Sequence, residues 1–127
     1  RAAGHPLHER EFVVYRGIKA GEILGTAMIG EELGKFRPIT SMTVVGPDGK
    51  IKDVRVLVYR ESRGSDVRRK RFLYQYLGKG RDDPIQINQD ITSISGATIS
   101  VRSMNAQVRK ALNVFHEAYF RKPGEEN

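Results

Sequence analysis

Alternating apolar and polar residues predict a β-hairpin in the first half of the chain. The segments 39–45 (ITSMTVV) and 51–59 (IKDVRVLVY) are rich in β-branched residues, and Gly46-Pro47-Asp48-Gly49 separates them. Asp48-Gly49 supplies the positive φ angle that a tight turn needs. We therefore expect two antiparallel strands joined by this turn.

Weaker strand patterns precede the hairpin. Residues 11–16 (EFVVYR) are rich in β-forming side chains, and residues 21–30 alternate loosely between apolar and polar positions. Residues 85–87 (IQI) favour a third, short strand. Residues 1–10 carry Gly, Pro and charge without periodicity, so we expect a flexible arm there.

Helical periodicity appears twice after the hairpin. Residues 66–77 predict a short helix, with Ser65 or Asp66 as its N-cap, Gly78 as its terminator, and Val67, Tyr74 and Leu77 on one stripe. In residues 101–120 the apolar positions recur at steps of three and four, which lays an apolar stripe along roughly 30 Å of helix. The stripe consists of Val101, Met104, Val108, Ala111, Leu112, Phe115, Ala118 and Tyr119.

These elements predict one α+β domain, in which a twisted antiparallel sheet carries a short middle helix and a long C-terminal amphipathic helix packed on it. A length of 127 residues fits a single domain. We place this domain at residues 11–122, between the arm at 1–10 and a tail at 123–127. No apolar run approaches the roughly 18 residues that a membrane span needs.

Composition narrows the possible chemistry. The absence of cysteine excludes disulfides, cysteine-ligated zinc, iron–sulfur clusters and thiol nucleophiles. The formal net charge is +7, with its densest cluster at Arg68, Arg69, Lys70 and Arg71. A basic surface suits anionic partners, although a solvated helix face explains the cluster more simply. Since no G-x-S-x-G, H-E-x-x-H or P-loop motif occurs, we expect no catalytic residues, and we predict no metal site.

Hydroxylated residues and one glycine crowd the segment that leads into the long helix: Thr92, Ser93, Ser95, Gly96, Thr98 and Ser100. A helix N-terminus offers unpaired N–H groups and the positive end of the helix dipole, and a glycine lets the backbone approach a ligand closely. Such an end suits a phosphate group. Plain capping by Thr98 or Ser100 is the other interpretation, and the residues themselves leave both open.

The string S-G-A-T-I-S at 95–100 resembles the S-G-A-T-[ILV]-[ST] signature of a family of FMN-binding domains. Members occur in the sodium-pumping NADH:quinone reductase, in the Rnf complex and in the regulator of nitrous-oxide reductase. The resemblance runs from about Thr40 to Tyr119 and includes a D-G-K-I turn at 48–51 and a V-x-V-L strand at 54–57. The family's E-T-P-G loop is present as E-S-R-G at 61–64.

The resemblance implies FMN as the cofactor, with its phosphate at Thr98. Family members carry the flavin there through a phosphoester bond made by a flavin transferase. The transferase recognises an Asp three residues before the Ser, where this chain has Thr92, so covalent and non-covalent binding both stay open. The implied cofactor-binding residues are Ser95, Gly96, Ala97, Thr98, Ile99, Ser100, Glu61, Arg63 and Gly64.

A flavin ring also needs apolar walls and a cation or donor beside it. The candidates for this role are Arg63, Tyr59, Met42, Ile94 and Ile99.

The resemblance further implies an electron-transfer module without a substrate site of its own, located outside the cytoplasm. Its expected partners are a quinone-linked complex or a cytochrome, and a flavin transferase. We expect no nucleic acid, and membrane association only through a partner or an anchor beyond this chain. The alternative function is a flavin-free basic module that uses the cluster at 68–71 on an anionic partner.

Overall fold

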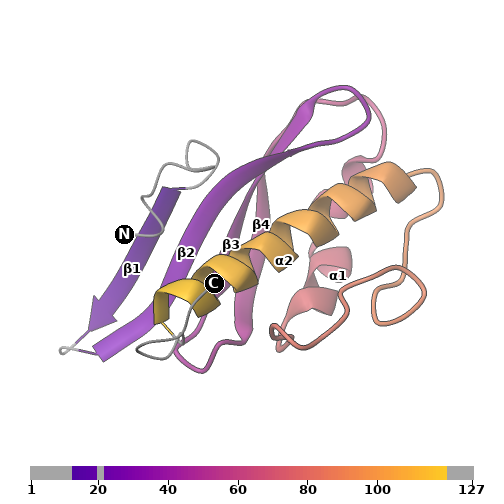
Figure 1. Cartoon of the computed structure of the whole chain (residues 1–127). Helices are drawn as coiled ribbons and strands as arrows, with labels where there is room; N and C mark the ends of the chain where they lie inside the picture. The colour runs from indigo at the N-terminus through magenta and orange to yellow at the C-terminus, as the bar shows by residue number, and fades with distance from the viewer. Residues whose placement is uncertain (1–12, 20–21, 120–127) are drawn as a thin grey trace.

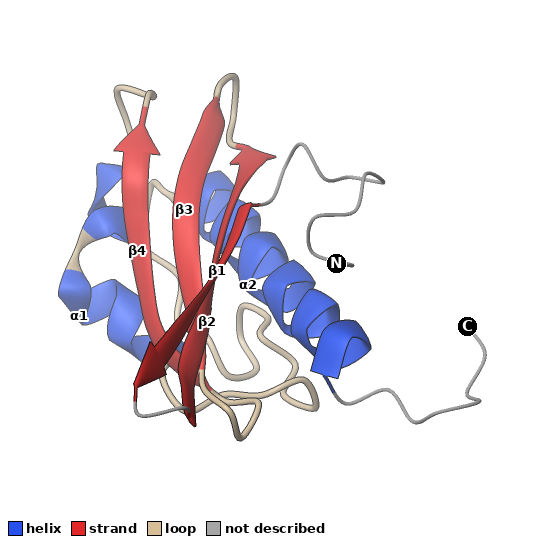
Figure 2. Ribbon diagram, turned by 90° about the vertical axis from the view of Figure 1, so that its left-hand side faces the viewer, coloured by secondary structure: helices blue, strands red, loops and turns tan. Residues whose placement is uncertain are grey.

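A four-stranded antiparallel sheet in the order β1-β2-β3-β4 forms one layer of the fold. The computed structural model describes residues 13–19 and 22–119. The strands are β1 (Val13–Lys19), β2 (Glu22–Leu33), β3 (Pro38–Val45) and β4 (Ile51–Tyr59). The long helix α2 (Thr98–Tyr119) and the short helix α1 (Lys70–Leu73) cover the same face of the sheet (Figure 2). The predicted α+β class is therefore confirmed.

The predicted hairpin is confirmed as β3 and β4. Their pairing runs from Ile39 opposite Tyr59 to Val45 opposite Ile51. Gly49 has a φ of 82° and donates its N–H to the Gly46 carbonyl over 2.9 Å, as a tight turn requires. The turn thus sets the register that brings the end of β4 to the end of the sheet where β2 passes into β3 (Figure 1).

The two earlier strand predictions are also met where the structure describes them. The strand expected at 11–16 is β1, although residues 11 and 12 lie outside the described residues. The strand expected at 21–30 is β2, which continues to Leu33. The predicted arm at 1–10 and tail at 123–127 lie outside the described residues, so the domain boundaries stay a prediction.

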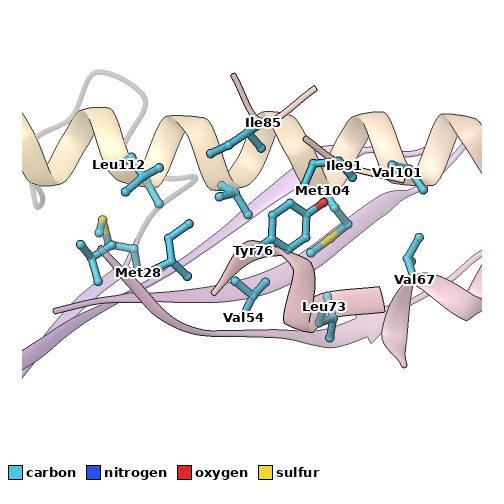
Figure 3. Close-up of a cluster of buried hydrophobic side chains, with 14 of the residues drawn as sticks. Met28, Val54, Val67, Leu73, Tyr76, Ile85, Ile91, Val101, Met104 and Leu112 are labelled. Atoms are coloured by element: carbon cyan, nitrogen blue, oxygen red, sulfur yellow. The ribbon is translucent and has the colours of Figure 1, made fainter. Parts of the chain in front are cut away.

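The core lies between the sheet and α2 (Figure 3). The predicted stripe is buried from Val101 to Phe115, but Ala118 is exposed. The side chain of Gln107 is also buried. Its Oε1 accepts from the Ser41 hydroxyl over 2.5 Å, and its Nε2 donates to the Ile39 carbonyl over 3.1 Å. Since buried polar groups must be paired, this amide fixes the position of α2 along β3.

The helix predicted at 66–77 is broken into three pieces: the 3-10 turns η3 (Ser65–Arg68) and η4 (Tyr74–Tyr76), with α1 between them. Arg69 interrupts the helix with extended backbone at φ −76° and ψ 142°. Neither Ser65 nor Asp66 caps a helix through its side chain. The break shifts the buried stripe, so Tyr74 and Leu77 are exposed while the core receives Val67, Phe72, Leu73 and Tyr76.

The short strand predicted at 85–87 is absent from the described structure, where only a single bridge joins Ile87 to Ile91. A φ of 49° at Ile85 and of 70° at Asn88 turns the chain away from extended geometry. The Asp90 carboxylate holds this turn by accepting the N–H groups of Ile85 and Gln86, each over 3.0 Å. No helix among the described residues is long and apolar enough to cross a bilayer.

Candidate functional site

A cleft of about 490 Å³ lies at the N-terminus of α2. Figure 1 shows this end of the helix beside the end of the sheet where β2 passes into β3. Three segments build the cleft: the β2–β3 turn, the loop after β4 and the start of α2. Its lining residues are Lys35, Phe36, Glu61, Ser62, Arg63, Gly64, Gly96, Ala97, Thr98, Ile99 and Ser100.

The start of α2 presents unpaired N–H groups to the cleft. The first helical hydrogen bond runs from the Val101 N–H to the Ala97 carbonyl over 2.9 Å. The N–H groups of residues 98–100 find no acceptor within the described part of the chain. No acidic residue stands in the first turn, so nothing there offsets the positive end of the helix dipole. This end of α2 therefore suits an anion.

Capping by a hydroxyl is not what the structure shows. The helix begins at Thr98, so Ala97 precedes it and offers no side-chain acceptor. The Ser100 hydroxyl is buried and bonds to Tyr59. Of the two interpretations that the sequence leaves open, the geometry favours the phosphate.

Gly96 lines the cleft beside open space. Its φ of 81° lies in the left-handed region that side chains rarely adopt. A Cβ atom built there meets no other atom within 4 Å. The glycine is therefore required by its backbone angle and not by crowding, and the space before it is free for a ligand.

Tyr59 ties the loop after β4 to the start of α2. Its hydroxyl donates to the Arg63 carbonyl. Because a phenol carries one hydrogen, the Ser100 hydroxyl donates the bond that joins its Oγ to the Tyr59 oxygen over 2.8 Å. Gly64 packs onto this pair with a φ of 80°, and a Cβ there would lie 2.5 Å from the Tyr59 oxygen and 2.7 Å from the Ser100 Oγ. The contact holds Arg63 at the rim of the cleft.

We expect Gly64→Ala to destabilise the fold by about 3 kcal/mol, because the methyl group adds steric overlap to left-handed backbone strain. Gly78 is the matched control, since its φ is 82° and a Cβ there meets nothing within 4 Å. Gly78→Ala should cost about 1–2 kcal/mol, which is the strain alone. Urea denaturation of both variants measures the difference, and equal losses would show that Gly64 is not a close-contact position.

Glu61 positions the turn that forms the other wall of the cleft. Its Oε2 accepts the N–H groups of Phe36 over 2.5 Å and of Arg37 over 2.9 Å. These bonds lower the pKa of the Glu61 carboxyl. Phe36 is thereby held at the cleft with 74% of its surface exposed. Glu61 was predicted as a cofactor-binding residue, and in the structure its carboxylate binds the backbone of the β2–β3 turn.

The structure brings together all the predicted site residues except Ser95, which does not line the cleft. Of the predicted ring contacts, Arg63 and Ile99 line it, and Tyr59 supports it from behind. Ile94 lines a different cavity, beside Phe72, and Met42 lies half-buried on β3 away from the cleft. The structure therefore does not bring these two residues to the cleft, and their contact with the ring stays a prediction.

Sequence reasoning missed Lys35, Phe36 and Ser62. The available signal was the short G-K-F-R-P segment at 34–38, which places an aromatic residue in a turn. Phe36 and Ile99 supply apolar surface, Lys35 and Arg63 supply cations, and residues 98–100 supply free N–H groups. This set fits a ligand with a phosphate at one end and a flat aromatic ring at the other.

Comparison with known proteins gives one family. The model of the FMN-binding domain family matches residues 34–113, which begin at the β2–β3 turn and end within α2. The matched range therefore contains all three segments that line the cleft. No curated protein matches the chain.

Proposed function

Because the chain belongs to the FMN-binding domain family and FMN is its cofactor, we propose that it works as an electron-transfer module. When bound, FMN supplies one- and two-electron chemistry. The sequence offers no nucleophile, acid–base or P-loop motif that would add a substrate reaction to this chemistry. An electron relay is the role that needs nothing more than the flavin site and a docking surface.

The free N–H groups at the start of α2 carry the proposal. They face a cleft that also presents the Thr98 hydroxyl, which is exposed and has no hydrogen-bond partner in the described structure. A phosphate held here would receive charge-assisted hydrogen bonds from the backbone and stabilisation from the helix dipole. Phe36 and Ile99 would flank the ring, while Lys35 and Arg63 would stabilise negative charge on it.

We further propose that Thr98 Oγ1 becomes esterified when a flavin transferase is present. In that step the bond from Oγ1 to the FMN phosphorus forms while the phosphoanhydride bond of a flavin dinucleotide breaks. The nucleoside monophosphate leaves, and the hydroxyl proton passes to a base of the transferase. Thr92 stands at the transferase's recognition position. Gln75 holds both backbone groups of Thr92, at 2.7 Å to its N–H and 3.1 Å to its carbonyl, and the Thr92 side chain is exposed.

Co-expression with a flavin transferase tests the Thr98 assignment. We expect intact-mass measurement to show the mass of one FMN less one water, and we expect Thr98→Ala to remove this adduct. The matched control is Ser100→Ala, because the Ser100 hydroxyl lies two residues away but bonds to Tyr59. An adduct that persists in Thr98→Ala would refute the assignment. If the wild type carries no adduct but added FMN raises its thermal midpoint, binding is non-covalent.

The basic cluster at 68–71 is our proposed docking surface for an acidic redox partner, such as a quinone-linked complex or a cytochrome, outside the cytoplasm. All four side chains are exposed, and only Arg69 forms an ion pair among the described residues, with Asp66 over 2.8 Å. The family match favours this role for the cluster over a flavin-free basic module.

A further inference from the structure

A further cavity, of about 370 Å³, lies between α2 and the loop that contains residues 86–88. It shares no lining residue with the cleft at the start of α2. Five of its six lining residues are polar or cationic, and none is acidic: Gln86, Ile87, Asn88, Arg102, Asn105 and Arg109. The balance of charge inside it is therefore positive.

Three of these residues form a single stripe on α2. Arg102, Asn105 and Arg109 follow at steps of three and four, so they share one face of the helix. The two arginines are two turns apart, which is about 10 Å along the helix axis. The stripe thus brings two arginines and one asparagine to the lining of the same cavity.

The hydrogen bonds around the cavity occupy the amide oxygens of its lining residues and leave their amide N–H groups free to donate. Tyr76 donates its hydroxyl to Asn105 Oδ1 over 2.6 Å. Burial raises the pKa of Tyr76, so the phenol keeps this proton. Asn105 is 3% exposed, and its Nδ2 group has no acceptor among the described residues. Gln86 likewise uses its Oε1 to accept from Gln89 over 2.7 Å, which leaves its amide donors.

The loop wall is held in a fixed shape. Ile85 and Asn88 both have positive φ angles, a conformation that costs a non-glycine residue about 1–3 kcal/mol. The carbonyl of Ile85 accepts from Arg109 over 2.6 Å, which fixes that guanidinium at the cavity. The nearby Asp90 carboxylate binds two backbone N–H groups and Lys79 over 3.5 Å, so it is not committed to either arginine. Arg102 is exposed and forms no ion pair in the described structure.

We propose that this cavity binds a small dianion, a phosphate or a dicarboxylate, between Arg102 and Arg109. Two guanidinium groups with an amide donor between them match a ligand that carries acceptors at both ends. The Nδ2 group of Asn105, for which the described residues provide no acceptor, donates to that ligand at the wall of the cavity. The cavity shares no lining residue with the flavin cleft, so this proposal for anion binding does not rest on the proposed electron-transfer function.

Titration of the full chain with succinate and with pyrophosphate, followed by proton–nitrogen NMR at constant ionic strength, tests this proposal. We expect saturable shifts at the backbone N–H groups of residues 86–88 and at the Asn105 side-chain amide. Saturation by succinate alone identifies a dicarboxylate site, and saturation by pyrophosphate alone identifies a phosphate site. Saturation by either probe supports a dianion site, and we expect the same affinity whether FMN is present or absent.

Arg102→Ala should weaken binding of the preferred probe by about tenfold or more, because it removes charge-assisted hydrogen bonds from an exposed side chain without disturbing the core. Arg81→Ala is the control, since Arg81 is also exposed and bonds to Asn113 of α2. It should leave the affinity unchanged. The proposal fails if neither probe saturates, if both variants respond alike, or if FMN displaces the probe, which would assign the cavity to the flavin phosphate.

Discussion

Gly96→Val is expected to weaken FMN binding by about a hundredfold or more, whereas Gly78→Val leaves the affinity unchanged. The two glycines have φ angles of 81° and 82°, and a Cβ at either one meets nothing within 4 Å. Valine therefore imposes a similar backbone strain at both positions. Only Gly96 lines the cleft, so only its valine fills the space that the phosphate needs before residues 98–100. Loss of two or three charge-assisted hydrogen bonds gives the expected size of the effect.

Thermal unfolding with and without FMN separates the two variants. Without FMN, both should melt at similar temperatures below that of the wild type. Added FMN should raise the midpoint of Gly78→Val as it does for the wild type, and should not raise that of Gly96→Val. Wild-type affinity in a folded Gly96→Val protein would place the phosphate elsewhere, and loss of affinity in both variants would indicate a general effect of strain.

The hairpin and α2 could be predicted because each carries its own signal. Asp48-Gly49 specifies the turn, and the three–four spacing from Val101 to Phe115 specifies a helix with one buried face. The middle helix was wrong in detail because its geometry is set by the core. Phe72 and Tyr76 pack edge to face at 5.6 Å on one side of the segment. A continuous helix would put Val67 on the opposite side, so burying it together with them requires the break at Arg69. A continuous helix with Val67, Tyr74 and Leu77 on its apolar side would also have carried Lys70 or Arg71 on that side.

The candidate site likewise contains residues that a local signal predicts and residues that only long-range contacts place. Residues 96–100 are contiguous, so hydroxyl content, a glycine and the start of a helix indicated a phosphate there, and the resemblance to the family signature implied the individual residues. Phe36 was missed because it reaches the cleft through the Glu61 carboxylate, which bonds to its N–H across 25 residues of sequence. Ile94 could not be placed from the sequence, because its neighbours along the chain do not decide which side of the segment faces the cleft. Contacts between distant residues settled both positions.

Reversing Arg68, Lys70 and Arg71 to Glu should slow electron exchange with an acidic partner by about tenfold to a thousandfold at low salt, because opposite charges steer the encounter. Arg69 is left unchanged, since its guanidinium pairs with Asp66. All three reversed side chains are exposed, so the fold and the FMN content should stay as in the wild type. The control reverses Lys50, Lys52 and Arg81, which are exposed cations elsewhere on the surface. Because Lys52 pairs with Asp48 and Arg81 bonds to Asn113, the thermal midpoint and FMN content of this control are measured first.

The FMN-loaded protein is first reduced, and its oxidation by an acidic ferric cytochrome is then followed by stopped flow over a range of ionic strength. This measurement decides whether the cluster docks the partner. The two charge-reversed proteins have the same net charge, so a long-range effect of total charge slows them equally. Docking through the cluster predicts a much larger loss for the Arg68, Lys70 and Arg71 variant, and a rate for the wild type that falls as salt rises. If the rate responds neither to salt nor to this reversal, the cluster is a solvated helix face and the partner binds another surface.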